Sequence, residues 1–371
     1  MGSLADELRR TIAHHGPITV AAYMETVLAH PRHGVYMSRD PFGAGGDFTT
    51  APEISQMFGE LIGLWCAVVW RAMGGPDPVA LVELGPGRGT LIADALRATK
   101  GKGPFRGATR LHLIETSPRL RDHQRQALTQ AGLVHPPEWH GTLDEIPSGA
   151  LLAVANEFFD ALPVRQFQQT EQGWRERLVG IGGADGAFAF VLAPSAAAQT
   201  LVPPSLKDAP AGNVFEWSPS AIGIAHALGK RLARFGGAAL IIDYGHTESA
   251  TGETLQAVRR HRFHDPLTEP GTADITAHVD FAALGQAATE GGAAVHGPTP
   301  QGDFLENLGI AARANALGAG ATPEQARDIA AAYHRLVDPA EMGTLFKVMA
   351  VTTPGMTAPP GFAQCADRSN G

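Results

Sequence analysis

The amino-acid sequence predicts an α/β protein with a mostly parallel, doubly wound sheet, an N-terminal helical region and a β-rich insertion. Beyond Pro76, short apolar runs alternate with stretches of helical periodicity, which is typical of strands joined by helices. The runs are apolar at successive positions, as strands are when helices cover both faces of a sheet. A glycine-rich turn, GPGRG, joins the first run to the helical stretch behind it. Together these observations favour a doubly wound sheet.

Residues 1–75 are expected to form a region of N-terminal helices and a lid loop. Apolar side chains recur at helical spacing through residues 4–30, where Gly16 and Pro17 interrupt the pattern and predict two separate helices. A longer apolar face that begins at Ile54 predicts a third helix.

The glycine-rich segment DPFGAGGD precedes this third helix and ends at Asp47. Because glycines permit large backbone rearrangements, we expect this segment to be a lid that closes over a ligand. Thr50 and Glu53 have the spacing of a capping box, with Pro52 in the first turn of the helix. Capping of the helix would explain these last residues without a lid.

The strands of the sheet are predicted at five apolar runs, residues 79–84, 111–115, 151–156, 238–243 and 345–352. Residues 76–371 then form the core, with insertions at about 163–218 and 246–342. The first insertion alternates polar and apolar residues and contains the turn sequence GGADG, which predicts antiparallel hairpins. The second is expected to be mixed, with a helical return before the last strand.

The composition excludes several classes of function. Lys and Arg number 29 against 37 Asp and Glu, a net charge of −8 with no basic run, so we expect no nucleic-acid partner. The longest apolar stretch, LIGLWCAVVW, has about half of the roughly 20 residues that span a bilayer, so we expect no membrane insertion. Only Cys66 and Cys365 are present, which excludes a disulfide framework and a cysteine zinc site. The N-terminus resembles neither a signal peptide nor a presequence, which predicts a cytoplasmic protein.

The glycine-rich turn is the first candidate binding site. Gly85, Gly87 and Gly89 form a G-x-G-x-G pattern, whereas dinucleotide-binding turns read G-x-G-x-x-G and phosphate-binding loops carry a lysine. Glu83 would repel a pyrophosphate, but it would attract a ligand that carries an ammonium and a sulfonium group. We therefore predict that these four residues bind S-adenosyl-L-methionine. A turn that is glycine-rich for packing alone is the alternative.

A second carboxylate, Glu115, ends the predicted strand at residues 111–115. At the end of the second strand a carboxylate can accept hydrogen bonds from both ribose hydroxyls, so we expect Glu115 to complete the cofactor site. The alternative is an exposed acid that caps the helix beginning near Ser117 and Pro118.

Several longer motifs resemble those of a known family. The MidA family, whose mitochondrial members are known as complex I assembly factor 7, has blocks similar to GDFTTAPEISQMFGELIG, ELGPGRGTL, NEFFDALPVRQF, IDYGH and MGTLFKVM. The resemblance runs from Pro17 to Thr352 and implies a Rossmann-like class I methyltransferase that depends on S-adenosyl-L-methionine. It also implies a protein substrate, since the mitochondrial members are assigned symmetric dimethylation of an arginine on the 49 kDa subunit of complex I. This chain is expected in the bacterial cytoplasm, and its eukaryotic relatives in the mitochondrial matrix.

The motif NEFFDALP directly follows the predicted strand at 151–156 and holds candidate catalytic residues. Asn156 with Phe159 resembles the N-P-P-Y pattern of amino-methyltransferases, in which an amide oxygen holds the target nitrogen and an aromatic ring faces the cationic centre. An arginine loses its proton only above about pH 12, so neighbouring carboxylates must orient it and take the proton. Glu157 and Asp160 would lie across one turn if a helix begins here, and with Asn156 they are the predicted catalytic residues. In the alternative interpretation, Asn156 and Asp160 cap that helix and the phenylalanines belong to the core.

A group of histidines and aspartates raises the hypothesis of a metal site, but it lacks a tight ligand spacing such as H-E-x-x-H. Its members are His261, His264, Asp265, Asp274, His278 and Asp280. Turn and cap roles suffice for them, so we predict no metal ion. Asp243, at the end of the run 238–243, either lines the substrate pocket or belongs to a simple turn.

Three functions follow from these patterns. The first is a protein-arginine methyltransferase that acts on a complex I subunit or its bacterial counterpart. The second is a small-molecule N- or O-methyltransferase, and the third is a cofactor-binding assembly chaperone without essential catalysis. The insertion at 163–218 favours a protein partner, because a small acceptor does not require a broad added surface.

Overall fold

The computed structural model of the chain describes residues 2–39, 43, 46–47, 49–182, 186–195 and 197–362. The chain divides into two compact units. We call them the accessory unit, formed by Met1–Thr49, Asp160–Gly223 and Glu248–Ala282, and the core unit, formed by Thr50–Phe159, Ile224–Thr247 and Ala283–Gly371.

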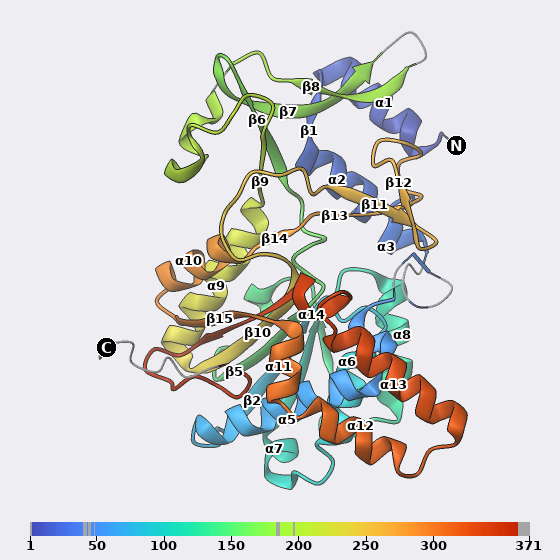
Figure 1. The fold of residues 1–371 in the computed structure, drawn as a ribbon, viewed down its shortest axis with the longest axis vertical. Coiled ribbons are helices and arrows are strands. Elements are labelled where there is room, and N and C mark those ends of the chain that lie inside the picture. The colour runs from blue at the N-terminus through green and yellow to red at the C-terminus, as the bar shows by residue number, and fades with distance from the viewer. Residues whose placement is uncertain are drawn as a thin grey trace. The chain divides into compact units, whose positions relative to one another are not determined.

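The core unit is built on one mixed sheet (Figure 1). Across the sheet the strands follow the order β4 (Glu138–His140), β3 (Thr109–Ile114), β2 (Val79–Leu84), β5 (Leu151–Asn156), β10 (Gly237–His246), β16 (Phe346–Thr352) and β15 (Ala294–Pro300). Neighbours from β4 to β10 pair in parallel, whereas β16 is antiparallel to both β10 and β15. The predicted mostly parallel sheet is confirmed.

All five predicted runs form strands of this sheet, and β2 and β5 have the predicted bounds. The sequence analysis missed β4 and β15. β4 has only three residues, too few for a periodic pattern. β15 contains Gly297 and Pro298, and its register shifts between His296 and Thr299, so its apolar pattern is interrupted.

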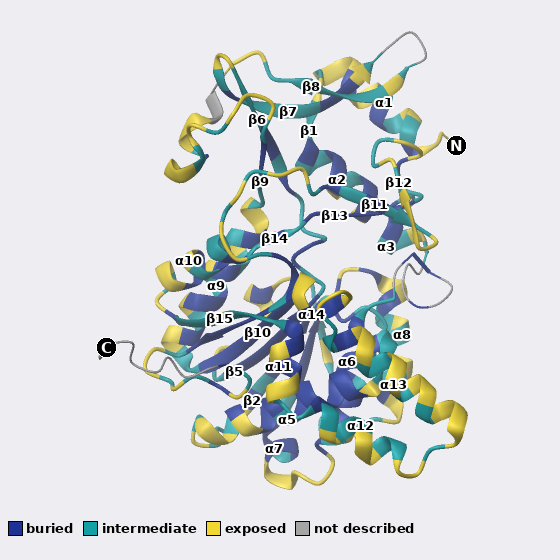
Figure 2. Cartoon of the chain, in the orientation of Figure 1, coloured by how far each residue is buried: buried dark blue, intermediate teal, exposed yellow. Residues whose placement is uncertain are grey.

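Helices cover the sheet of the core unit. They are α4 (Ala51–Ile54), α5 (Gln56–Ala72), α6 (Thr90–Ala98), α7 (Gly103–Ala108), α8 (Pro118–Thr129), the 3-10 helix η1 (Leu143–Glu145), α9 (Pro219–Phe235), α10 (Phe281–Glu290), α11 (Gln301–Asn307), α12 (Ile310–Gly318), α13 (Pro323–Val337) and α14 (Met342–Leu345). Every residue of β5 is buried, and Figure 2 shows the central strands buried along their length. Burial of successive residues means that both faces of the sheet are shielded, as in a doubly wound fold. Among the described residues, no helix is both long and apolar enough to cross a membrane.

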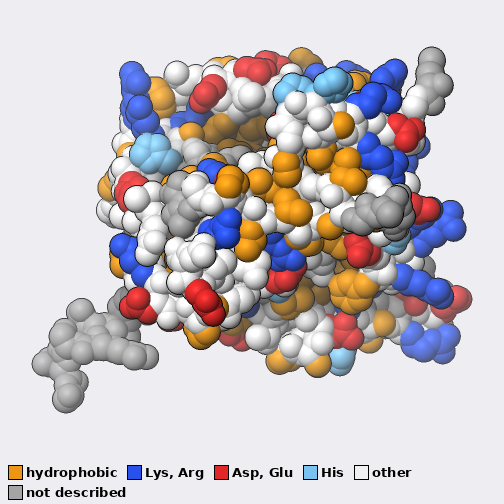
Figure 3. All heavy atoms as spheres, turned by 90° about the horizontal axis from the view of Figure 1, so that it is seen from above, with side chains coloured by type: hydrophobic (Ala, Val, Ile, Leu, Met, Phe, Trp, Pro, Cys, Tyr) orange, Lys and Arg blue, Asp and Glu red, His pale blue; other side chains and the backbone are white. Residues whose placement is uncertain are grey.

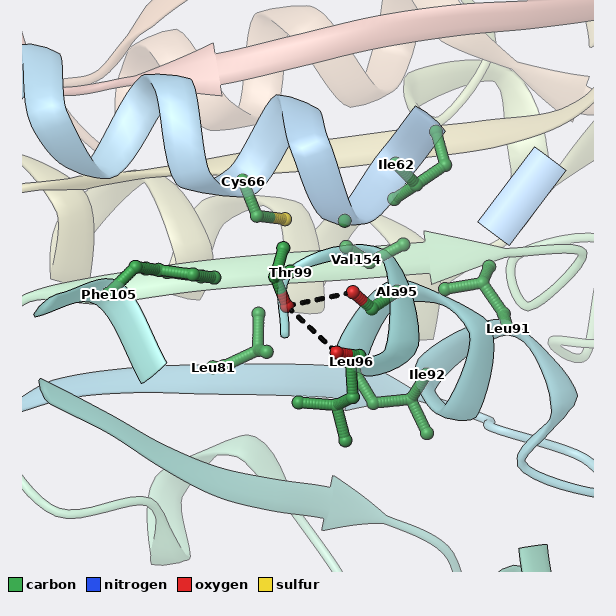
Figure 4. Close-up of a pocket in the computed structure, with 11 residues that line it drawn as sticks. Ile62, Cys66, Leu81, Leu91, Ile92, Ala95, Leu96, Thr99, Phe105 and Val154 are labelled. Carbon is green, nitrogen blue, oxygen red and sulfur yellow. Dashed lines mark hydrogen bonds between the residues drawn. The ribbon is translucent and has the colours of Figure 1, made fainter. Parts of the chain in front are cut away.

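Helices α5 and α6 pack closely because a glycine of α5 faces the backbone of α6. A Cβ atom at Gly63 would lie 2.5 Å from Ala95 Cα. Beside this contact, Figure 4 shows apolar side chains and Cys66 around a cavity of about 10 Å³, which is room for about one water molecule. At its edge Thr99 donates to the carbonyl oxygens of Ala95 and Leu96, at 2.9 and 3.1 Å. Burial raises the pKa of the Cys66 thiol to about 12, so Cys66 is a protonated packing residue.

The accessory unit combines N-terminal helices with antiparallel strands. Its helices are α1 (Leu4–His15), α2 (Val20–Ala29), α3 (Val35–Ser38) and the 3-10 helices η2 (Ala197–Thr200) and η3 (Pro204–Leu206). One sheet has the order β1 (Ile18–Thr19), β7 (Gly173–Gly182), β6 (Arg165–Thr170) and β9 (Val214–Trp217), with β8 (Ala187–Leu192) paired to β7. A second has the order β12 (Arg262–His264), β11 (Gln256–Arg259) and β13 (Asp274–Thr276), and β14 (Val279–Asp280) follows in the chain. The two N-terminal helices and the antiparallel hairpins expected within 163–218 are confirmed.

The division of the chain differs from the boundary expected at residue 75. α4 and α5 belong to the core unit, because α5 packs against α6. Residues 1–49 fold instead with the β-rich insertion, where Ile18 of β1 pairs with Val179 of β7. This pairing joins segments far apart in the sequence, so no local pattern predicts it.

The segment expected to act as a lid lies mostly outside the described residues, which include only Gly43, Gly46 and Asp47 of it. The predicted capping box is wrong. Thr50 accepts no side-chain capping hydrogen bond, and Glu53 instead accepts one from Thr90 Oγ1. The helix also breaks after Ile54 and restarts at Gln56, with Ser55 as its cap.

The contact between α5 and α6 gives a test of the core. Gly63→Ala should lower the free energy of unfolding by about 1–3 kcal/mol, because the added methyl group meets the backbone of Ala95. Chemical denaturation followed by circular dichroism would measure the change. Gly223→Ala is the matched control, because this helical glycine has open space around it and should not be destabilised by the methyl group. An equal effect of both substitutions would contradict the close packing.

Candidate cofactor and acceptor site

The carboxyl ends of β2 and β5 carry the candidate site. From β2 the chain continues to β3 on one side of it, whereas β5 lies on its other side. In open α/β sheets, ligands bind beyond the carboxyl ends of the strands at such a topological switch point. The turn after β2 holds the three glycines, and β5 ends at Asn156, which Glu157 follows.

The turn between β2 and α6 requires its glycines. Gly85, Gly87 and Gly89 have φ angles of 62°, 52° and 82°, in the left-handed region that favours glycine. A Cβ atom at Gly85 would also lie 2.7 Å from Phe158 Cδ2, and one at Gly89 would lie 3.2 Å from Gln124 Cα. Backbone conformation and close packing therefore both contribute to the glycine pattern.

Glu83, near the end of β2, is a buried acid without a counterion. The residue is 3% exposed, and Oε2 has no hydrogen-bond partner in the described part of the chain. Burial raises the pKa of this carboxyl group to about 8, against the smaller opposite effect of a hydrogen bond from the backbone of Ile92. Because a buried carboxylate is costly without a counterion, the site suits a ligand that brings a positive charge.

Glu115 lies immediately after β3 and is held by two hydrogen bonds. Its Oε1 accepts from the Ser117 amide at 2.8 Å, and its Oε2 accepts from Gln124 Nε2 at 3.2 Å. Burial raises the pKa of the carboxyl group, and these two hydrogen bonds oppose that rise. The alternative of an exposed capping acid does not hold, because Glu115 is buried and the side chain of Ser117 caps α8. Each carboxylate oxygen can accept more than one hydrogen bond, so Glu115 can also accept from a ligand.

Gln124 connects three parts of this site. Its Nε2 donates to the Gly87 carbonyl oxygen at 2.8 Å as well as to Glu115, and its Oε1 accepts from Trp139 Nε1 at 2.8 Å. Gln124 is fully buried, so its amide has no competing water. It therefore fixes the glycine turn and the second acid relative to β4.

Asn156 and Glu157 form a polar pair at the end of β5. Asn156 Nδ2 donates to Glu157 Oε1 at 3.2 Å, whereas the buried Asn156 Oδ1 lacks a partner among the residues that the structure describes. Glu157 has a φ of 48°, which is uncommon for a residue with a side chain. The same Oε1 accepts from the Ala51 amide at 3.0 Å, so Glu157 caps α4.

The helix expected to begin after β5 is absent, since residues 157–162 form a bend and a turn. Asp160 therefore does not lie one helical turn from Glu157, and neither Asn156 nor Asp160 caps a helix there. Asn156 and Glu157 belong to the core unit, whereas Asp160 belongs to the accessory unit. Within that unit, the Asp160 carbonyl oxygen accepts from the Ala277 amide at 3.0 Å.

Buried acids also gather in the accessory unit. Burial, followed by the charge of Asp160, raises the pKa of Asp274 to about 7, while Tyr36 donates to Asp274 at 3.1 Å. Asp47 is 1% exposed, pairs with Arg39 and accepts from the Arg260 amide at 3.0 Å. Asp274 thus has a buried position beyond the turn role expected for it.

Sequence analysis missed Gln124 and the role of Asp243. Gln124 stands between Leu120 and Leu128 at four-residue spacing on the buried face of α8, and a polar residue in such a row is the available signal. Asp243 is fully buried, and its two oxygens accept from the amides of Phe159 and Tyr244 at 3.0 and 2.9 Å. It holds the backbone after β5 in place.

The fold and this site define a Rossmann-like enzyme for a cationic nucleotide, which is the class of S-adenosyl-L-methionine-dependent methyltransferases. The glycine turn, the unneutralised Glu83 and the anchored Glu115 fit this cofactor. A family model described as "Putative S-adenosyl-L-methionine-dependent methyltransferase" matches residues 61–299. The chain belongs to this family and is an S-adenosyl-L-methionine-dependent methyltransferase.

Named relatives are similar over nearly the whole chain. "Protein arginine methyltransferase NDUFAF7 homolog, mitochondrial" of Drosophila melanogaster is 43% identical over 96% of this chain and 86% of its own length. The Homo sapiens protein arginine methyltransferase NDUFAF7, also mitochondrial, is 40% identical over 91% of this chain and 80% of its own length. These matches confirm the resemblance recognised from the motifs.

A solved structure shares the fold. A Burkholderia thailandensis protein described as a "likely methyl transferase", crystallised with S-adenosyl-homocysteine, is 33% identical with a TM-score of 0.82. The match covers 96% of this chain and 93% of that protein. The cofactor product bound to this relative agrees with the cofactor class of the chain.

The raised pKa of the buried Glu83 leads us to expect that cofactor binding depends on pH. Without ligand, protonation of Glu83 favours the folded state, so this contribution is fully present below the ordinary pKa of 4.5 and is lost as pH rises toward about 8. The ionised form is the one that pairs with a cation. Affinity for S-adenosyl-homocysteine should therefore rise with pH, by up to about tenfold per unit between about pH 6 and pH 7.5.

Calorimetric titration at several pH values would measure this dependence. Glu83→Gln should bind more weakly and lose the pH dependence, while keeping the size of the side chain. A dependence unchanged in Glu83→Gln would show that another group titrates.

Proposed function

We propose that the enzyme transfers methyl groups to arginine side chains of a protein, and that this protein is a complex I subunit of the 49 kDa type or its bacterial counterpart. The relatives named above are protein arginine methyltransferases and align over nearly the whole chain. Within the chain, the supporting observation is the buried Asn156 Oδ1 without a described partner, next to the carboxylate of Glu157. An acceptor oxygen beside a carboxylate suits the several N–H donors of a guanidinium.

Glu83, Gly85, Gly87, Gly89 and Glu115 would hold S-adenosyl-L-methionine. When bound, this cofactor supplies a methyl group on a positively charged sulfur. Glu83 would pair with the ammonium group of the cofactor, and Glu115 would accept from its ribose hydroxyls. The glycines leave space for the ligand beside the backbone of the turn.

The proposed catalytic residues act mainly by alignment. Asn156 would accept a hydrogen bond from the target nitrogen and direct the lone pair of that nitrogen toward the transferred carbon. Glu157 would face the guanidinium charge and accept the proton released as the new bond forms. Its Oε1 is fixed by the Ala51 amide, which restricts the carboxylate to one orientation. Asp160 stays the third predicted catalytic residue and would provide a second carboxylate.

The surface is compatible with a protein partner. On the face in Figure 3, acidic and basic side chains are interspersed with hydrophobic ones. Such a mixed surface is typical of protein contacts, whereas a nucleic acid requires a clustered basic field.

The acceptor can be identified by labelling. Incubation of the enzyme, methyl-labelled cofactor and the purified 49 kDa-type subunit should yield labelled dimethylarginine, detected by mass spectrometry. Asn156→Ala should lower kcat by about 10²-fold or more, because alignment of the nucleophile is lost. Glu157→Gln should also lower kcat, although its amide oxygen can still accept from Ala51.

Both variants should bind S-adenosyl-homocysteine as the unmodified enzyme does, which separates catalysis from cofactor binding. Label on small metabolites alone, with none on polypeptide arginine, would favour the small-molecule methyltransferase. Full activity of both variants would overturn the assignment of Asn156 and Glu157.

A second substitution separates catalysis from a chaperone role. Gly87→Val should abolish cofactor binding, because a β-branched residue is strained at a φ of 52°. Assembly of the partner complex in cells that carry this variant should then fail. Gly107→Ala is the control, since nothing lies within contact distance of its added methyl group. Normal assembly with Gly87→Val would mean that the biological role does not require methylation.

A further inference from the structure

An edge of the core sheet brings two imidazoles and a carboxylate together. β3 and β4 pair in parallel with His112 opposite Glu138 and Ile114 opposite His140. Because side chains alternate along a strand, His112, Glu138 and His140 all lie on one face of the sheet. His112 Nδ1 lies 3.0 Å from His140 Nε2, and Glu138 Oε2 lies 4.0 Å from each of these nitrogens.

We propose that His112, Glu138 and His140 bind a divalent transition-metal ion such as Zn²⁺. Two imidazole nitrogens and one carboxylate oxygen form a ligand set that such ions prefer, and water would complete the coordination. With bonds of about 2.0–2.1 Å, nitrogens on one tetrahedral ion lie roughly 3.3 Å apart, so His112 and His140 need to separate by only a few tenths of an ångström. The Glu138 side chain is 62% exposed, so surrounding residues leave it room to move toward the two nitrogens.

The surroundings of the imidazoles favour a cation. His112 is 3% exposed, so its ring is held away from bulk water. On the other side of the second ring, Glu145 Oε2 lies 3.9 Å from His140 Nδ1. This distance is too long for a hydrogen bond, but the negative charge of the carboxylate favours a cation bound at the opposite nitrogen.

Positive charges also lie near the group. Arg231 of α9 donates to the carbonyl oxygens of Ile146 and Pro147, and Arg121 of α8 donates to the His140 carbonyl oxygen at 3.3 Å. Glu138 and Glu145 bring two negative charges that offset these two arginines. The ligand set, rather than the net charge, is therefore what favours a divalent ion.

The ion would stabilise the strand that supports the cofactor site. The His140 carbonyl oxygen accepts from the Glu115 amide at 3.0 Å. Trp139, between the ligands Glu138 and His140, donates to Gln124, which in turn holds Glu115 and the Gly87 carbonyl. Fixing β4 should therefore increase affinity for the cofactor product without any contact between ion and cofactor.

Direct titration of the full chain with Co²⁺ and Zn²⁺ tests the site. After dialysis against a chelator, the protein should bind one Co²⁺ with visible absorption typical of a low-symmetry site, and Zn²⁺ should displace it. His140→Ala should weaken Zn²⁺ binding by about 100-fold and Glu138→Gln by about tenfold. His226→Ala, which removes an exposed histidine of α9, is the matched control and should bind normally.

Thermal unfolding of each variant would verify folding. If His140→Ala is unstable, Glu138→Gln still tests the site, because Glu138 is exposed and its substitution should not disturb the fold. Zn²⁺ should also tighten S-adenosyl-homocysteine binding severalfold in the unmodified enzyme but not in Glu138→Gln. Failure to bind either metal below about millimolar concentration would overturn the site. Metal affinities of Glu138→Gln and His140→Ala equal to that of the unmodified enzyme would also overturn it. Metal binding with unchanged affinity for S-adenosyl-homocysteine would overturn only the link to the cofactor.

Discussion

The buried carboxyl group of Glu83 is the constraint around which the cofactor site is built. An ionised carboxylate without a counterion is costly in a low-dielectric interior, and Glu83 of the central strand β2 is only 3% exposed, so burial raises its pKa to about 8. The three glycines of the turn after β2 carry no side chains. Gln124 then fixes the turn to Glu115, so that the two acids are held in one rigid arrangement. A cationic nucleotide would bring the counterion that the described part of the chain does not provide.

A buried acid also supports the backbone at the end of β5. Asp243 accepts from the amide of Phe159, which follows β5, and from the amide of Tyr244 in its own strand β10. Asn156 and Glu157 can then face an acceptor without also supporting the chain, except for the cap that Glu157 provides to α4. Asp243 thus has a structural role, whereas Asn156 and Glu157 have the proposed chemical roles. Such supporting residues keep the geometry of a site rigid.

Local sequence patterns predicted the strands and turns whose structure depends on neighbouring residues. The apolar runs of β2 and β5, the turn with its three glycines and the acid near the end of each of β2 and β3 are each defined within a short stretch of the chain, and all of them were found in the sequence. The capping box at Thr50 and the helix after β5 were wrong because partners distant in sequence decide these segments, Thr90 for Glu53 and Ala51 for Glu157. The accessory unit and the His112 group depend on pairing between distant strands, which periodicity along the chain does not reveal.

Glu157 shows how chemistry and folding compete at one position. A left-handed backbone costs a non-glycine residue of the order of 1 kcal/mol, which glycine at this position would avoid. Glycine would also remove the cap of α4, which contributes about 1 kcal/mol, and the carboxylate that faces the proposed acceptor. Laboratory selection for heat resistance alone would therefore gain little by replacing Glu157, and the proposed chemistry would oppose its loss.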